Sequence, residues 1–149
     1  MDTEEELAGA LATLQRRSPE ELAAFIVSLL YDPPPGVRSY VEAFIAAAEP
    51  AKVATIVRRE IGVLRSGERD YDVRHRRSAE IVARAGYTLG IIERVVLPSD
   101  LALARKLLSE LLDAEQQIAE QCYEDDFGAE ELFTRVRTLL SASTVAVNC

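Results

Sequence analysis

The sequence predicts an all-α fold of six to seven helices in antiparallel hairpins, forming a bundle or a short α-solenoid-like array. Apolar residues recur every three or four positions along most of the chain, which is the period of one helix face. Glycine occurs only 7 times and aromatic residues make up 6% of the sequence, a composition that favours helices over strands. No segment alternates cleanly between apolar and polar residues, as a half-buried strand does.

The size and charge of the chain limit what it can be. Its 149 residues, 48% of them hydrophobic, predict a single globular domain spanning 1–149 that needs no metal or disulfide for stability. The net charge of −8 disfavours nucleic acid and anionic membranes as partners. Cys122 and Cys149 match no metal or redox motif, and the acidic N-terminus does not resemble a signal peptide. We therefore expect a cytoplasmic protein that does not act at a membrane.

The first two expected helices are the best marked. The first covers 3–16, and its apolar residues at spacings of four and three are Leu7, Leu11 and Leu14. The second begins after Ser18, the N-cap residue, which forms a capping box with Glu21 at the third helical position, while Pro19 occupies the first position. The prolines at 33–35 end this helix because three prolines cannot continue it.

Proline, glycine or polar breaks separate the remaining helices. Their expected ranges are 37–48, 51–64, 73–96, 101–123 and 129–141. The apolar residues that share one face of the first of these are Val37, Tyr40, Val41, Phe44, Ile45 and Ala48. Helices two and three, four and five, and six and seven could each form a hairpin. The tail 142–149 is expected to be frayed.

Gly86 and Gly90 lie inside the expected 73–96 helix, at a spacing of four. Each costs about 1 kcal/mol relative to alanine in a helix interior. Close packing against a neighbouring helix explains both glycines best, and a kink is the alternative.

A basic region is the most conspicuous local feature. Nine basic and five acidic residues lie between Lys52 and Arg84. The favoured interpretation is a solvated helix face on which charges four residues apart neutralise one another, as between Glu80 and Arg84. The alternatives are a site for an acidic protein or a second copy, and a nucleic-acid-associated regulator that uses Arg58–Arg84. The candidate partner-binding residues are Arg74, Arg76 and Arg77.

No motif predicts catalytic, cofactor-binding or metal-ligating residues. His75 is the only histidine, so a histidine-based zinc site lacks ligands. The acidic run 124–126 lacks the alternating oxygen ligands of a calcium loop and fits a solvated turn. An enzyme with a pocket between helices is the weakest functional hypothesis.

Part of the sequence resembles a bacterial family of helical proteins of unknown function. The residues concerned are Leu97-Pro98-Ser99-Asp100, Leu103, Ala104, Leu107, Leu108, Leu111, Glu124-Asp125-Asp126, Gly128 and Phe133, together with the stretch Ser18–Asp32. Some members are similar to the helical-repeat regions of proteins with SWIM-type zinc fingers. The resemblance implies an α-solenoid-like fold and a binding role, but Phe127 departs from the pattern and no zinc-finger cysteines are present.

The expected function follows from these observations. An array of amphipathic helices offers an extended surface, and no reactive constellation competes with it as the functional feature. We therefore expect a protein–protein interaction or scaffold domain, which could self-associate and which needs no cofactor.

Overall fold

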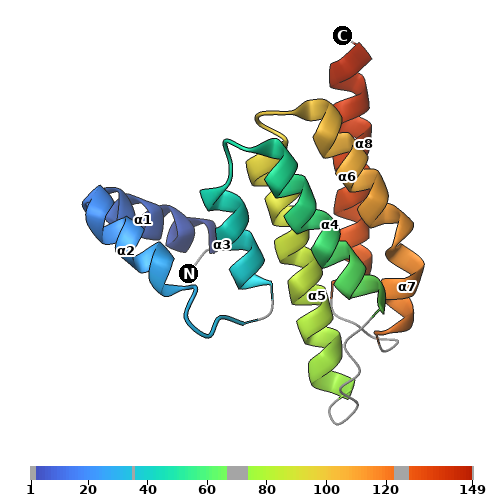
Figure 1. Ribbon diagram of the computed structural model, residues 1–149, viewed down its shortest axis with the longest axis horizontal. Coiled ribbons are helices and arrows are strands. Elements are labelled where there is room, and N and C mark those ends of the chain that lie inside the picture. The colour runs from blue at the N-terminus through green and yellow to red at the C-terminus, as the bar shows by residue number, and fades with distance from the viewer. Residues whose placement is uncertain (1–2, 35, 67–73, 123–127, 149) are drawn as a thin grey trace. The chain divides into compact units, whose positions relative to one another are not determined.

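The computed structural model describes residues 3–34, 36–66, 74–122 and 128–148 (Figure 1). Within these ranges the side chains of 74–78 and 144–148 lie outside the description. Every regular element in the described ranges is helical, which confirms the all-α fold class. The chain divides into two compact units, Met1–Pro33 and Pro34–Cys149. The single domain expected from the length stays a prediction.

The Met1–Pro33 unit contains two helices, α1 (Thr3–Gln15) and α2 (Pro19–Ser28). The start of α2 is as predicted, because the Ser18 hydroxyl accepts a hydrogen bond from the Glu21 backbone N–H at 3.1 Å. Neither helix contains a buried residue. This unit therefore has helical structure without a core of its own.

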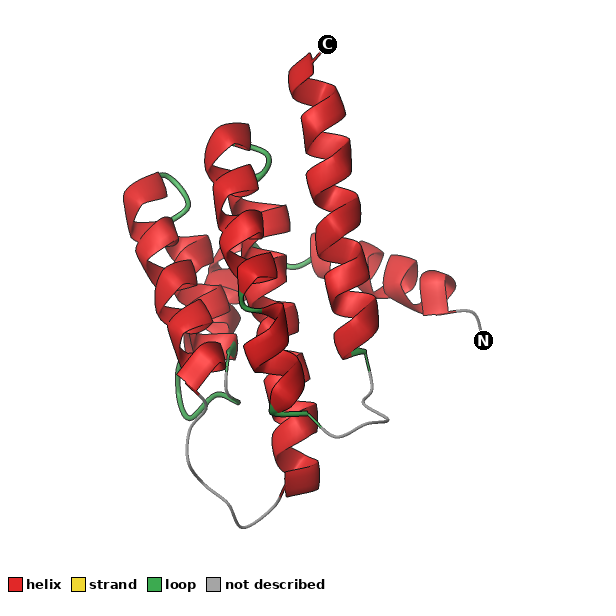
Figure 2. Ribbon diagram, turned by 90° about the vertical axis from the view of Figure 1, so that its right-hand side faces the viewer, coloured by secondary structure: helices red, strands yellow, loops and turns green. Residues whose placement is uncertain are grey.

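The Pro34–Cys149 unit contains the remaining helices. They are α3 (Val37–Ile45), α4 (Pro50–Ser66), α5 (Arg74–Ile91), the π-helical segment η2 (Ile92–Val96), α6 (Leu101–Asp113), α7 (Glu115–Glu120) and α8 (Ala129–Asn148). Helices α3, α4 and α5 pack on one another, and α6 packs on α8. These two groups join where α4 meets α6 and where α5 meets α8. Figures 1 and 2 show the long helices of this unit running side by side as a bundle.

The core of this unit is made by the apolar stripes that the sequence predicts. In the 73–96 segment the stripe residues are at most 9% exposed, namely Ile81, Ala85, Leu89, Ile92 and Val96. In the 101–123 segment five of the six stripe residues are at most 1% exposed, namely Ala104, Leu107, Leu111, Ala114 and Ile118, and the sixth, Cys122, is partly buried against the core. Phe133 and Val136 of α8 complete the core. The three-to-four spacing therefore identified the inward faces of these helices correctly.

The predicted inward face of α3 is wrong in part. Phe44 is 58% exposed and Ile45 is 60% exposed, whereas Ser39 and Ala43 are buried. Small residues on the inner side let α3 approach α4 and α5, and they place the Ser39 hydroxyl beside a carboxylate of α4. The large apolar residues dominated the sequence pattern and concealed this smaller face.

Three predicted helix limits also differ from the structure. The 73–96 helix changes to a π-helical turn, closed by a hydrogen bond of 2.8 Å from Leu97 N–H to Ile92 C=O. The 101–123 helix is interrupted at Ala114, where no proline or glycine marks the break. The predicted helix end at Ser141 is wrong, since α8 continues to Asn148. The 141–148 stretch has no proline or glycine to stop it.

Candidate interaction surface

Helix α1 presents an uncovered apolar stripe. Leu7 is 65% exposed, Leu11 is 57% exposed and Leu14 is 49% exposed. Their spacings of four and three place them on one side of the helix. A stripe of this kind is buried in a typical globular protein, so its exposure on α1 marks a surface available for contact.

Helix α2 and the turn after it carry the same kind of surface. Phe25 is 60% exposed and Tyr31 is 80% exposed, and Val27 and Leu29 are exposed as well. Ten large apolar side chains are exposed in the described part of the chain, and seven of them lie between residues 7 and 31. The exposed apolar surface is therefore concentrated in the Met1–Pro33 unit. Because Phe25 and Val27 lie about 200° apart around α2, from 100° per residue, the name N-terminal apolar face is used only for the α1 stripe of Leu7, Leu11 and Leu14.

The two ends of α1 carry opposite charges. Glu4, Glu5 and Glu6 occupy its first turn, where the helix dipole favours negative charge. Arg16 and Arg17 follow its last residue, and their backbone N–H groups bond to Thr13 and Leu14 carbonyls at 3.2 and 3.0 Å. Arg17 also pairs with Glu21 at 3.3 Å, but both side chains are more than half exposed. Such an exposed pair adds little stability, and Glu20 and Glu21 in the first turn of α2 offset the charge of the two arginines.

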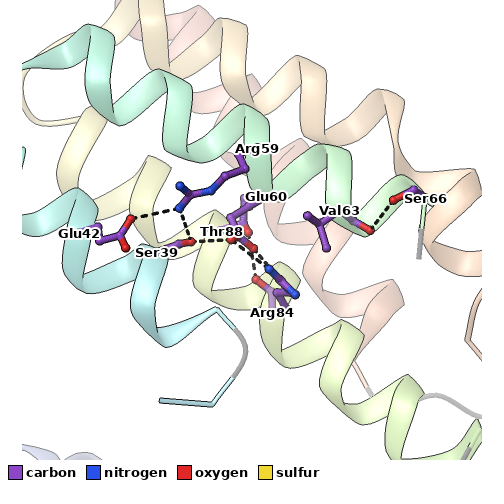
Figure 3. A network of polar contacts seen from close by, with 8 residues as sticks. All are labelled: Ser39, Glu42, Arg59, Glu60, Val63, Ser66, Arg84 and Thr88. Atoms are coloured by element: carbon purple, nitrogen blue, oxygen red, sulfur yellow. Dashed lines mark hydrogen bonds and ion pairs between the residues drawn. The ribbon is translucent and has the colours of Figure 1, made fainter. Parts of the chain in front are cut away.

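A buried polar cluster occupies the interface of α3, α4 and α5 (Figure 3). At its centre is Glu60 of α4, which is 2% exposed. Arg84 of α5 donates to its two carboxylate oxygens, from Nε at 2.6 Å and from Nη2 at 3.2 Å. Ser39 of α3 donates its hydroxyl to Oε1 at 2.5 Å. One carboxylate thus joins three helices.

The surroundings of Glu60 keep its carboxyl ionised. Burial by itself raises the pKa of Glu60, but the hydrogen bonds from Arg84 and Ser39 and the charges of Arg84 and Arg59 outweigh it. The pKa therefore lies below its ordinary value. Arg59 also links Ser39 to Glu42, with Nη2 3.0 Å from Ser39 Oγ and 3.2 Å from a Glu42 oxygen. Because Ser39 is only 4% exposed, we interpret the cluster as a structural connection.

The two glycines of α5 have different surroundings. A Cβ atom at Gly90 would lie 3.0 Å from Cε2 of Tyr40, whereas at Gly86 its nearest neighbour would be Cδ1 of Leu132 at 3.9 Å. The Tyr40 ring is held there by Arg94, whose Nη1 donates to the Tyr40 hydroxyl at 3.0 Å. The close-packing interpretation therefore holds at Gly90. A shallow groove of ≈ 360 Å³ runs along this side of α5.

The basic region is partly neutralised where its side chains are described. Arg58 pairs with Glu110 at 3.2 Å, Arg59 pairs with Glu42, and Arg84 pairs with Glu60. All three pairs join different helices, so charge spacing along one helix could not reveal them. These pairs reduce the positive charge that this region can offer to a phosphate backbone.

The candidate partner-binding arginines are the remaining part of this region. Arg74, Arg76 and Arg77 belong to the first turn of α5, but their side chains lie outside the described part of the structure. Their role in binding a partner stays a prediction.

Two other features of the sequence, the His75 side chain and the 124–126 acidic run, also lie outside the described residues. Within the described residues, no three metal-ligating side chains come together. No helix of the described part is both long and apolar enough to cross a membrane.

The described part of the chain is an all-α protein with a packed helical bundle and an N-terminal pair of helices on which several large apolar side chains are exposed. Comparisons with protein-family models, curated proteins and solved structures find no significant match to the chain. The resemblance to the helical regions of proteins with SWIM-type zinc fingers therefore stays a prediction.

Proposed function

We propose that this protein is a helical protein-interaction domain that binds its partner through the N-terminal apolar face. The observation that carries the proposal is the unequal distribution of apolar surface in the described part of the chain. Seven of its ten exposed large apolar side chains lie between residues 7 and 31. Contiguous apolar surface on a protein marks an interaction site more often than scattered single residues do.

The stability of short helices supports the same proposal. Helix α1 has 13 residues and α2 has 10, and neither buries a residue. Isolated helices of this length are marginal in water, because their stability comes mainly from packing of an apolar face. A partner that covers this face would supply that packing.

Site-specific photo-crosslinking from the apolar stripe tests the proposal. A photoreactive amino acid replaces Leu11 in the full-length chain, which is expressed in the cells it comes from and then irradiated. We expect a covalent adduct with another polypeptide, because a partner on the stripe lies within reach of this position. The matched control carries the same photoreactive group at Gly9, which is exposed and where an added Cβ atom would have no neighbour within 4 Å.

The position of the adduct decides the outcome. Gly9 lies about 160° around the helix from Leu11, from 100° per residue, so it should give much less adduct. Equal yields at both positions, or no adduct at either, would refute an interaction through the N-terminal apolar face. Both substituted chains should fold like the unmodified chain, which is checked by comparing their far-ultraviolet circular dichroism spectra.

A further inference from the structure

We draw no further inference here: the strongest candidate, the shallow groove along α5 that Tyr40, Gly90 and Arg94 line, carries nothing because the close approach of Tyr40 to Gly90 and its hydrogen bond from Arg94 already account for these residues as helix packing, and nothing in the structure shows what covers the groove.

Discussion

Replacement of Arg84 by methionine tests the role of the buried polar cluster. The substitution keeps much of the length of the side chain but removes the guanidinium that donates two hydrogen bonds to Glu60. The Glu60 side chain is 3% exposed and that of Arg84 is 20% exposed, so the remaining carboxylate has little access to water. Removing one partner of a buried ion pair costs about 3–5 kcal/mol.

The expected loss for R84M lies at the lower end of that range. Ser39 still donates a hydrogen bond to Glu60, and the charge of Arg59 still acts on it. We therefore expect the free energy of unfolding to fall by about 3 kcal/mol. For a chain of this size, that loss corresponds to a decrease in Tm of about 6–12 °C.

Urea denaturation followed by far-ultraviolet circular dichroism measures the loss, with R58M as the matched control. Arg58 also pairs with a glutamate of another helix, but the side chains of this pair are 43% and 36% exposed. The control should lose less than about 1 kcal/mol. The double variant E60M/R84M leaves no unpaired charge, so it should be more stable than R84M. Equal losses for R84M and R58M would refute the reasoning.

Two further predictions concern Glu60 and the glycines of α5. The pKa of Glu60 is lowered in the folded state. The ionised Glu60 carboxylate therefore stabilises the fold fully above the ordinary glutamate pKa of about 4.3. This stabilisation is lost as the pH falls through the folded-state pKa. The difference in unfolding free energy between wild type and E60Q should therefore shrink below about pH 4. Urea titrations from pH 7 to 3 measure this difference, and a constant value would contradict the prediction. G86A should raise the free energy of unfolding by about 1 kcal/mol, because a methyl group there has room. G90A should be stabilised less than G86A, or destabilised, because its methyl group would press on Tyr40. Thermal melts compare the two variants, and equal increases in stability would show that Tyr40 moves freely.

Local signals in the sequence predicted much of the fold. The start of α2 was predictable because Ser18, Pro19 and Glu21 are close in sequence, and their contacts form within one turn. The inward faces of α5 and α6 were predictable because each is a long stripe of apolar residues. The extension of α8 was missed because small and β-branched residues favour a helix weakly but do not stop it.

The polar cluster could not be predicted in the same way. Ser39 lies 21 residues before Glu60 and Arg84 lies 24 residues after it. Only the packing of α3, α4 and α5 brings these side chains together. In the sequence, Glu60 is one of the acidic residues of a basic region that was expected to be solvated, but the structure shows that Glu60 is buried. Its type and spacing alone carried no signal of burial.

Only the apolar residues of the candidate interaction surface could be predicted from the sequence, and not their exposure. The spacing of Leu7, Leu11 and Leu14 identifies an apolar face, but a sequence pattern does not reveal whether the face meets the same chain or another one. The structure shows that these side chains are exposed and that no residue of α1 is buried, and a partner on this face stays a prediction. The same limit explains why Phe44 and Ile45, although apolar and helical, were assigned to the inner face of α3.

Amide hydrogen exchange of α1, measured with and without the partner that photo-crosslinking captures, tests most directly whether a partner covers the N-terminal apolar face. A helix of 13 residues without a buried residue should exchange rapidly when it is alone. We expect the partner to increase protection of the α1 amides, while the amides of α6, whose inward residues are already buried, stay equally protected. Protection of α1 that the partner leaves unchanged would contradict the account.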